Sequence, residues 1–227
     1  MIEDYDLSTS EGRKEAAVAA AAHKEILEEA AEMLRGPSRK KRQQASSVLA
    51  FAAKEDAALV QPYADDVADA LNRPEDQTRW NALNALDLMG KAGTSYADDV
   101  LEAAEDAMYD EDSGVLREAA FRFFCGYAAS SPENSDKVWP RIDEAIQCYH
   151  GNQEFAQMLS ALVDLAHSDE ISDAALVGLA TRMRFDAGSA KGTLGMRSRQ
   201  IVEAMKARGL EFPEEPAAQE GDEGGDE

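Results

Sequence analysis

The pentapeptide Tyr-Ala-Asp-Asp-Val occurs twice in the sequence, at Tyr63–Val67 and again 33 residues later at Tyr96–Val100. Self-similarity at a period of roughly 20 to 50 residues is the sequence signature of an array of small stacked units rather than of one closed core. The repeated pentapeptide therefore predicts a repeat architecture, and the rest of the chain carries a similar period.

Four segments of the chain each carry one apolar helical stripe. Within each stripe the apolar residues are spaced i, i+3, i+4 and i+7, as on one face of an amphipathic helix. The stripes start 37, 38 and 38 residues apart, and a weaker fifth set follows after 40 residues. The stripes are Ala45, Val48, Leu49 and Ala52; Ala82, Ala85, Leu86 and Met89; Ala120, Phe123, Phe124 and Tyr127; Met158, Ala161, Leu162 and Leu165; and the weaker Ser198, Ile201, Val202 and Met205.

A partner helix is expected between each stripe and the next. The pentapeptide then begins the second helix of a repeated hairpin, with its tyrosine and valine facing inward and its aspartates facing water. Its spacing of 33 rather than 37 predicts that the first unit has a loop about four residues longer than the second. Pro140 is expected in the first turn of a third partner helix, because proline removes a hydrogen bond from a helix interior.

The two ends of the chain differ from the repeats. Ser8 and Glu11 can form a capping box that opens a helix running to Leu34, and Gly36 and Pro37 end it. The stretch 211–227 has eight acidic residues, no basic one and little to bury, so it is expected to be disordered. The sequence thus predicts an N-terminal capping helix within 1–37, a repeat solenoid over 38–210 and an acidic tail over 211–227.

The starts of the units resemble those of HEAT-type repeats. Asp76-Gln-Thr-Arg79-Trp-Asn-Ala82 combines an acid, an arginine and spaced small residues, and Asp112 with Arg117 is similar. The resemblance implies an all-α, right-handed superhelix of about five helical hairpins plus an N-terminal helix, in a bacterial or archaeal member of that group. It also implies a ladder in which these arginines reach the next unit. The fourth unit has Phe155 at the arginine position and the fifth has Gly195.

Catalytic and metal-binding motifs are missing from the sequence. Its three histidines are far apart, and neither His-Glu-x-x-His, Cys-x-x-Cys nor a phosphate-binding glycine loop occurs. Cys125 and Cys148 are expected to be buried, reduced thiols. The net charge of −22 disfavours nucleic acid and anionic membrane as partners unless charges are segregated. No cofactor and a cytoplasmic location are expected.

One basic cluster contrasts with the acidic composition. Five cations fall within eight residues around a predicted helix start, where they oppose the helix dipole; they are Arg35, Arg39, Lys40, Lys41 and Arg42. They could pair with Glu28, Glu29 and Glu32, or they could form a site for a phosphate or an acidic partner.

Two functions are open at this point. The leading hypothesis is a non-enzymatic scaffold that binds another protein on its solenoid surface, because solenoids expose large extended faces. The alternative is a nucleic-acid-binding protein related to the HEAT-like DNA alkylation repair glycosylases. Its candidate residues are Trp80, Trp139, Arg141, Arg182 and Arg184, although Trp139 fits better as a core residue. A continuous positive inner face would favour the alternative, whereas arginines paired with aspartates would favour the scaffold.

Overall fold

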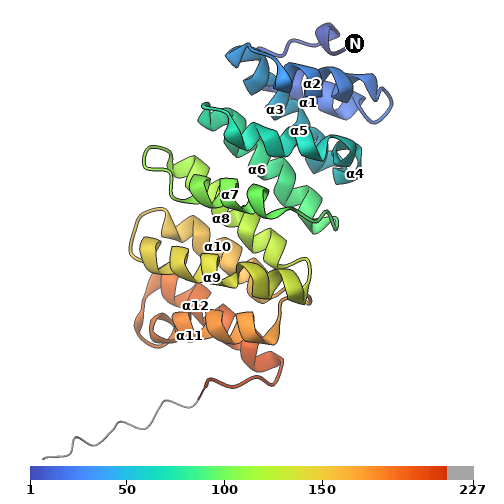
Figure 1. Cartoon of the computed structure of the whole chain (residues 1–227). Helices are drawn as coiled ribbons and strands as arrows, with labels where there is room; N and C mark the ends of the chain where they lie inside the picture. The colour runs from blue at the N-terminus through green and yellow to red at the C-terminus, as the bar shows by residue number, and fades with distance from the viewer. Residues whose placement is uncertain (214–227) are drawn as a thin grey trace, which may run out of the picture.

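The structure, a computed structural model, describes residues 1–213, and these fold into a stack of α-helices joined by short turns (Figure 1). Within the described residues there are three short 3-10 helices and no strand. The α-helices are α1 Ser10–Ala19, α2 Glu25–Arg35, α3 Arg39–Glu55, α4 Ala57–Val60, α5 Ala64–Asp69, α6 Asp76–Lys91, α7 Asp98–Met108, α8 Gly114–Ala128, α9 Pro132–Tyr149, α10 Phe155–Ala166, α11 Asp173–Ser189 and α12 Gly192–Ala207.

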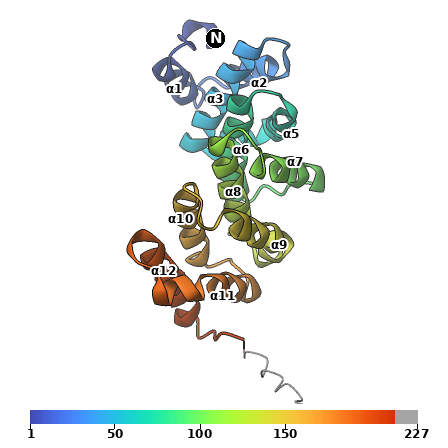
Figure 2. The ribbon, with the colours of Figure 1, turned by 90° about the vertical axis from the view of Figure 1, so that its left-hand side faces the viewer.

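The helices form two layers. One layer contains α1, α3, α6, α8, α10 and α12, each packed on the next, and the other contains α2, α5, α7, α9 and α11. In Figure 2 the first layer runs down the left-hand side, and its end helices α1 and α12 project further out than α6 and α8. The first layer therefore bounds the concave face of the stack, and we call it the concave layer and the other the convex layer.

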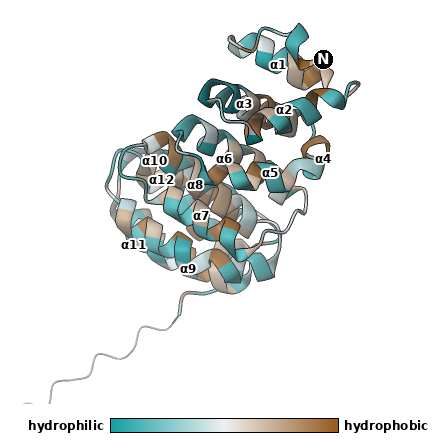
Figure 3. Cartoon of the chain, turned by 45° about the horizontal axis from the view of Figure 1, so that its top comes forward, coloured by the Kyte–Doolittle hydropathy of each residue, from teal (hydrophilic) through white to brown (hydrophobic). Residues whose placement is uncertain are grey.

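The core lies between the two layers, because each helix buries one side. All four strong apolar stripes predicted from the sequence face this core except Ala161, which is half-buried. Hydrophilic and hydrophobic segments alternate along the helices for the same reason (Figure 3). The expected all-α, right-handed superhelix of HEAT type is confirmed. When each hairpin is taken to start with a helix of the concave layer, as the predicted units do, α12 has no partner helix after it. Helices α1 and α2 then form a hairpin of their own.

The N-terminal segment corrects the prediction of one continuous helix. The chain leaves the helix at Ala20 and starts α2 at Glu25, which lets both helices pack against α3. The predicted capping box between Ser8 and Glu11 does not form. Instead the hydroxyl of Thr9 accepts a hydrogen bond of 3.0 Å from the backbone N–H of Gly12.

The repeated pentapeptide also differs from the prediction in detail. Tyr63 and Tyr96 both precede the regular α-helix, since α5 starts at Ala64 and α7 at Asp98. Val67 is buried, whereas Val100 is only half-buried. The four additional residues of the first unit form α4, a single helical turn, rather than an open loop.

Pro140 lies in the interior of α9 rather than in its first turn. The helix starts earlier than predicted, at Pro132, because Ser131 caps it by accepting a hydrogen bond of 3.1 Å from the backbone N–H of Asn134.

Glycine allows a close approach between α6 and α8. A Cβ atom on Gly126 would lie 1.8 Å from Oδ1 of Asp87, so the carboxylate occupies the space that any side chain there would need. The other oxygen of Asp87 accepts a hydrogen bond of 2.9 Å from Lys91, and burial raises the pKa of this carboxyl.

A second close approach, between α9 and α11, yields a testable prediction. A Cβ atom on Gly178 would lie 2.7 Å from the ring of Trp139. We expect Gly178→Ala to lower the free energy of unfolding by about 1–2 kcal/mol, because overpacking displaces the indole. Urea denaturation measures this change.

Gly188 provides the matched control, because it lies in the same helix and a Cβ atom there would meet nothing within 4 Å. Gly188→Ala should stabilise the protein by about 0.5–1 kcal/mol, since alanine loses less backbone entropy in a helix. Equal effects of the two substitutions would contradict the packing argument.

Candidate functional site

Charge is segregated between the two layers. The helices of the concave layer carry fourteen lysines and arginines against eight aspartates and glutamates. The helices of the convex layer carry five against eighteen. The acidity of the described helices is therefore concentrated on the convex layer, and the concave face is the side on which an anionic partner meets the least repulsion.

The concave face carries a stripe of half-exposed amide and aromatic side chains on α3 and α6. Amide side chains both donate and accept hydrogen bonds, and two are already oriented by neighbours. Asn81 donates to the hydroxyl of Ser46 over 3.1 Å, and Asn84 accepts from Arg122 over 3.2 Å. The half-buried members of the stripe are Gln43, Gln44, Phe51, Gln77, Trp80, Asn81, Asn84 and Leu88. Such a surface suits the N–H and C=O groups of an extended chain.

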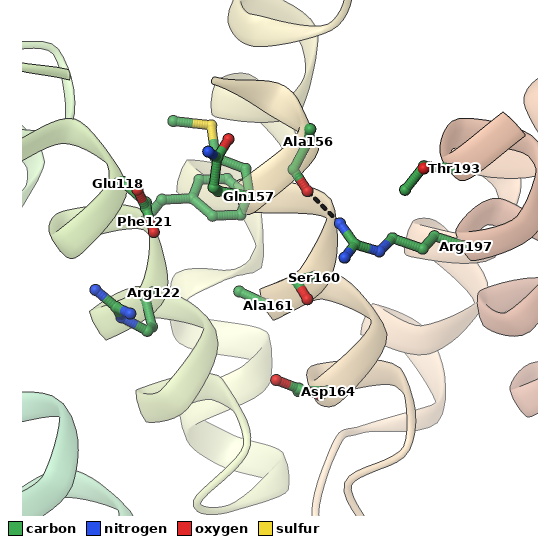
Figure 4. Close-up of a pocket in the computed structure, with 11 residues that line it drawn as sticks. Glu118, Phe121, Arg122, Ala156, Gln157, Ser160, Ala161, Asp164, Thr193 and Arg197 are labelled. Carbon is green, nitrogen blue, oxygen red and sulfur yellow. Dashed lines mark hydrogen bonds between the residues drawn. The ribbon is translucent and has the colours of Figure 1, made fainter. Parts of the chain in front are cut away.

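A groove of about 520 Å³ continues the concave face over α8, α10 and α12. Figure 4 shows Gln157, Ser160 and Asp164 along α10 between the side chains of the other two helices. Arg197 of α12 crosses the groove and donates to the carbonyl oxygen of Ala156. The groove is mixed in charge, with Glu118 and Asp164 opposite two arginines.

A smaller hollow of about 300 Å³ lies at the other end of the face, between the N-terminal segment, α3 and the start of α6. Lys40, Arg13 and three glutamines line it. Nearby, the ammonium of Lys14 lies 5.8 Å from the ring centroid of Phe51. This end of the concave face is therefore its most basic part.

The structure divides the predicted basic cluster. Arg35 pairs with Asp66 over 2.6 Å, and Arg42 is buried against Glu75, where it also donates to the carbonyl oxygen of Gly36. Arg42 is therefore not available to a partner, which corrects its assignment as a binding residue. Arg39, Lys40 and Lys41 are exposed and form no ion pair within residues 1–213.

None of the five cations forms an ion pair with Glu28, Glu29 or Glu32, the acids considered as partners, in the part of the chain that the structure describes. The hydrogen bond from Arg42 lowers the pKa of Glu75.

A ladder of arginines runs along the concave layer, but with different acids from those predicted. Arg79 reaches Asp110 over 3.0 Å, and Arg117 makes a two-pronged contact with Glu154 whose Nε–Oε2 distance is 2.8 Å. With Arg42 and Glu75, each arginine thus contacts an acid 31 to 37 residues ahead. The hydrogen bond from Arg117 lowers the pKa of Glu154.

The predicted acids Asp76 and Asp112 are not partners in this ladder. Asp112 donates its backbone N–H to Asp110 over 3.1 Å, and Asp76 forms no ion pair among the described residues. The acids that are used lie before successive helices of the concave layer: Glu75 before α6, Asp110 before α8 and Glu154 before α10.

No arrangement typical of catalysis stands out in the described residues. No group of three or more His, Cys, Asp or Glu side chains there could hold a metal ion, and no described helix could cross a membrane. Cys125 is buried as expected, but Cys148 is exposed on α9, which corrects that prediction. His150 contacts Asp186 over 2.7 Å and packs on Phe155, joining the ends of α9 and α11.

Sequence reasoning missed the amide stripe. Gln43, Gln44, Asn81 and Asn84 recur at helical spacing opposite the buried stripes of α3 and α6. That spacing can be seen in the sequence, but polar residues on an outer helix face are ordinarily just solvated. Only the curvature of the stack shows that these residues lie on a concave face.

Comparison with known proteins identifies the fold alone. No protein-family model matches the chain, and no curated protein matches it. An engineered protein solved by the Northeast Structural Genomics Consortium has a TM-score of 0.62 and 15% identity, over 87% of this chain and 92% of that one. A designed armadillo repeat protein in complex with the peptide (KR)4 has a TM-score of 0.61 and 11% identity, over 86% and 92%.

The structure of Kap121p bound to Nup53p has a TM-score of 0.68 and 13% identity, over 86% of this chain and 21% of that one. Together with the two layers and the period of the described helices, these similarities show that the chain has the HEAT/armadillo-like helical repeat fold.

Proposed function

We propose that this chain is a non-enzymatic interaction module that binds an extended peptide segment of another protein along its concave face. The observation that carries the proposal is the stripe of half-exposed amides and aromatics on α3 and α6, continued by the groove over α8, α10 and α12. Two proteins of similar fold support it, one in complex with the peptide (KR)4 and one bound to Nup53p.

Nucleic-acid binding is the second candidate, and the exposed cations Arg39, Lys40 and Lys41 favour it. Three arginines of the concave layer, however, are already used in ion pairs of the ladder. The three exposed cations lie together at one end of the face, and a single basic end does not make the continuous positive track that a phosphate backbone requires. Peptide binding therefore accounts for more of the face.

The test is selection of binding peptides from a random display library, followed by measurement of Kd for chosen variants. We expect Asn84→Ala and Gln157→Ala to weaken binding, and Trp80→Leu to weaken it by about 30-fold, because aromatic anchors dominate interface energies. Glu102→Ala, an exposed position on the convex layer, is the matched control and should leave Kd unchanged.

Urea denaturation of each variant separates lost binding from lost folding. Peptides whose affinity the concave substitutions leave unchanged would contradict the proposal. Retention of single-stranded nucleic acid, with no peptide selected, would favour the second candidate instead.

A further inference from the structure

The most basic part of the concave face carries more cations than acids. Helix α3 carries five cations and a single acid, Glu55. Only one of those cations, Arg42, is in an ion pair within residues 1–213. Lys14 of α1 lies beside the same helix, over Phe51. These exposed ammonium groups leave a local positive potential in a protein of net charge −22.

The chain contains an acidic segment that is absent from the described residues. Residues 214–227 include seven acids and no lysine or arginine. The described part ends just before this segment, where Phe212 lies 4.7 Å from the guanidinium of Arg184 on α11. Helix α11 belongs to the convex layer and packs on α12, so the acidic segment starts one helix away from the concave layer, at the end of the stack opposite to the cations.

The length of this segment matches the length of the face. The path from α11 to α3 crosses α12, α10, α8 and α6, so it consists of five steps between packed helices. At 8–10 Å a step this path is roughly 40–50 Å long. Fourteen extended residues span at most about 46–50 Å. Arg197 and Arg122 lie along the path, in the groove over α8 to α12.

We propose that residues 214–227 bind along the concave face of their own chain, with their carboxylates meeting Lys14, Lys40 and Lys41. The face then prefers extended acidic segments, and the tail competes with any partner that binds there. The competition rests on the proposed function, whereas the docking of the tail does not. Because exposed charges attract each other only within a Debye length, the docking is sensitive to salt.

Paramagnetic relaxation in the full chain tests the docking directly. A nitroxide is attached at Gly224→Cys in a Cys148→Ser background, which leaves only the buried Cys125. At about 0.02 M salt we expect the backbone amide signals of Gln43 and Gln44 to lose most of their intensity, and at about 0.5 M salt to recover it, because the Debye length shortens several-fold. Signals of α7, on the convex layer, should be unaffected at both concentrations.

Two charge variants provide the comparison. Replacing Lys14, Lys40 and Lys41 with Gln should abolish the loss of signal. Replacing Lys24, Lys137 and Lys191 with Gln removes the same charge outside the hollow and should preserve it. Urea denaturation confirms that both variants remain folded.

Full intensity at low salt, or a loss that the two variants change equally, would overturn the proposal. A loss seen only when spin-labelled chain is mixed with separate isotope-labelled chain would overturn it too, since the tail would then dock on a second copy. If the tail docks but no peptide is selected by the display experiment, only the proposed function fails. If peptides bind while the tail stays away, only this inference fails.

Discussion

Glu75→Gln should lower the free energy of unfolding by about 3 kcal/mol, because it leaves the guanidinium of Arg42 buried without a compensating charge. Both side chains are nearly inaccessible to water, and Arg42 contacts Glu75 through two of its nitrogens. Urea denaturation at neutral pH measures the loss. Glu102→Ala, which removes an exposed acid from α7, should change stability by less than about 0.5 kcal/mol.

The ion pair between Arg42 and Glu75 also determines the direction in which the free energy of unfolding changes with pH. The hydrogen bond from Arg42 lowers the pKa of Glu75 in the folded protein. Its stabilisation is therefore fully present above the unfolded pKa of about 4.3 and is lost as the pH falls through the lower folded value. The difference between the native chain and Glu75→Gln should shrink as the solution is acidified. A difference that is constant with pH would show that the charge of Glu75 does not stabilise the fold.

Phe123→Ala should cost about 4 kcal/mol, because it opens a cavity in the most aromatic part of the core. The ring of Phe123 is fully buried, with centroids 5.5 Å from Tyr96, 5.4 Å from Phe124 and 6.2 Å from Tyr127. Since Tyr96 also donates its hydroxyl to the carbonyl oxygen of Leu86, this cluster joins α6, α8 and the segment before α7.

The position of the cluster predicts a second effect. The stability of a solenoid is approximately a sum of unit terms and nearest-neighbour interface terms, so a weak central interface lets the two halves unfold separately. Trp80 in α6 and Trp139 in α9 report on the two sides of Phe123.

Single-tryptophan variants should therefore give coincident urea midpoints in the native background and separate midpoints with Phe123→Ala. Phe185→Ala, at a position that is 79% exposed, is the control. Coincident midpoints with Phe123→Ala would show that the halves stay coupled through other contacts.

Period and stripe spacing were sufficient to predict the solenoid, because burial of Leu49, Leu86 and Phe124 depends only on helical geometry. The positions at which helices start and stop are harder to predict. Nothing local separates Ala20 from a helix interior, and the break there follows from the packing of α1 and α2 on α3. Propensity favours Pro140 in a first turn, but the cap at Ser131 starts α9 at Pro132 and leaves Pro140 in the helix interior.

The candidate site could be predicted only in part. The arginines of the ladder are identifiable from their position in each unit. Their acids are not, because each acid that is used, Glu75 or Asp110, lies within two residues of another acid, Asp76 or Asp112. The burial of Arg42 in an ion pair could be learned only from the structure. The five cations of the basic cluster look alike in sequence, and only Arg42 faces a buried carboxylate.

The ladder has a consequence for the size of the protein. Each of its arginines pairs with an acid that lies ahead of it in the sequence, so a chain with one additional copy of the 38 residues from Glu75 to Asp112 would still offer every arginine such an acid. The concave face would lengthen by one step and its curvature would continue. Length is thus a property that duplication or deletion of whole units can adjust without a new core, and the span of a bound segment would change with it.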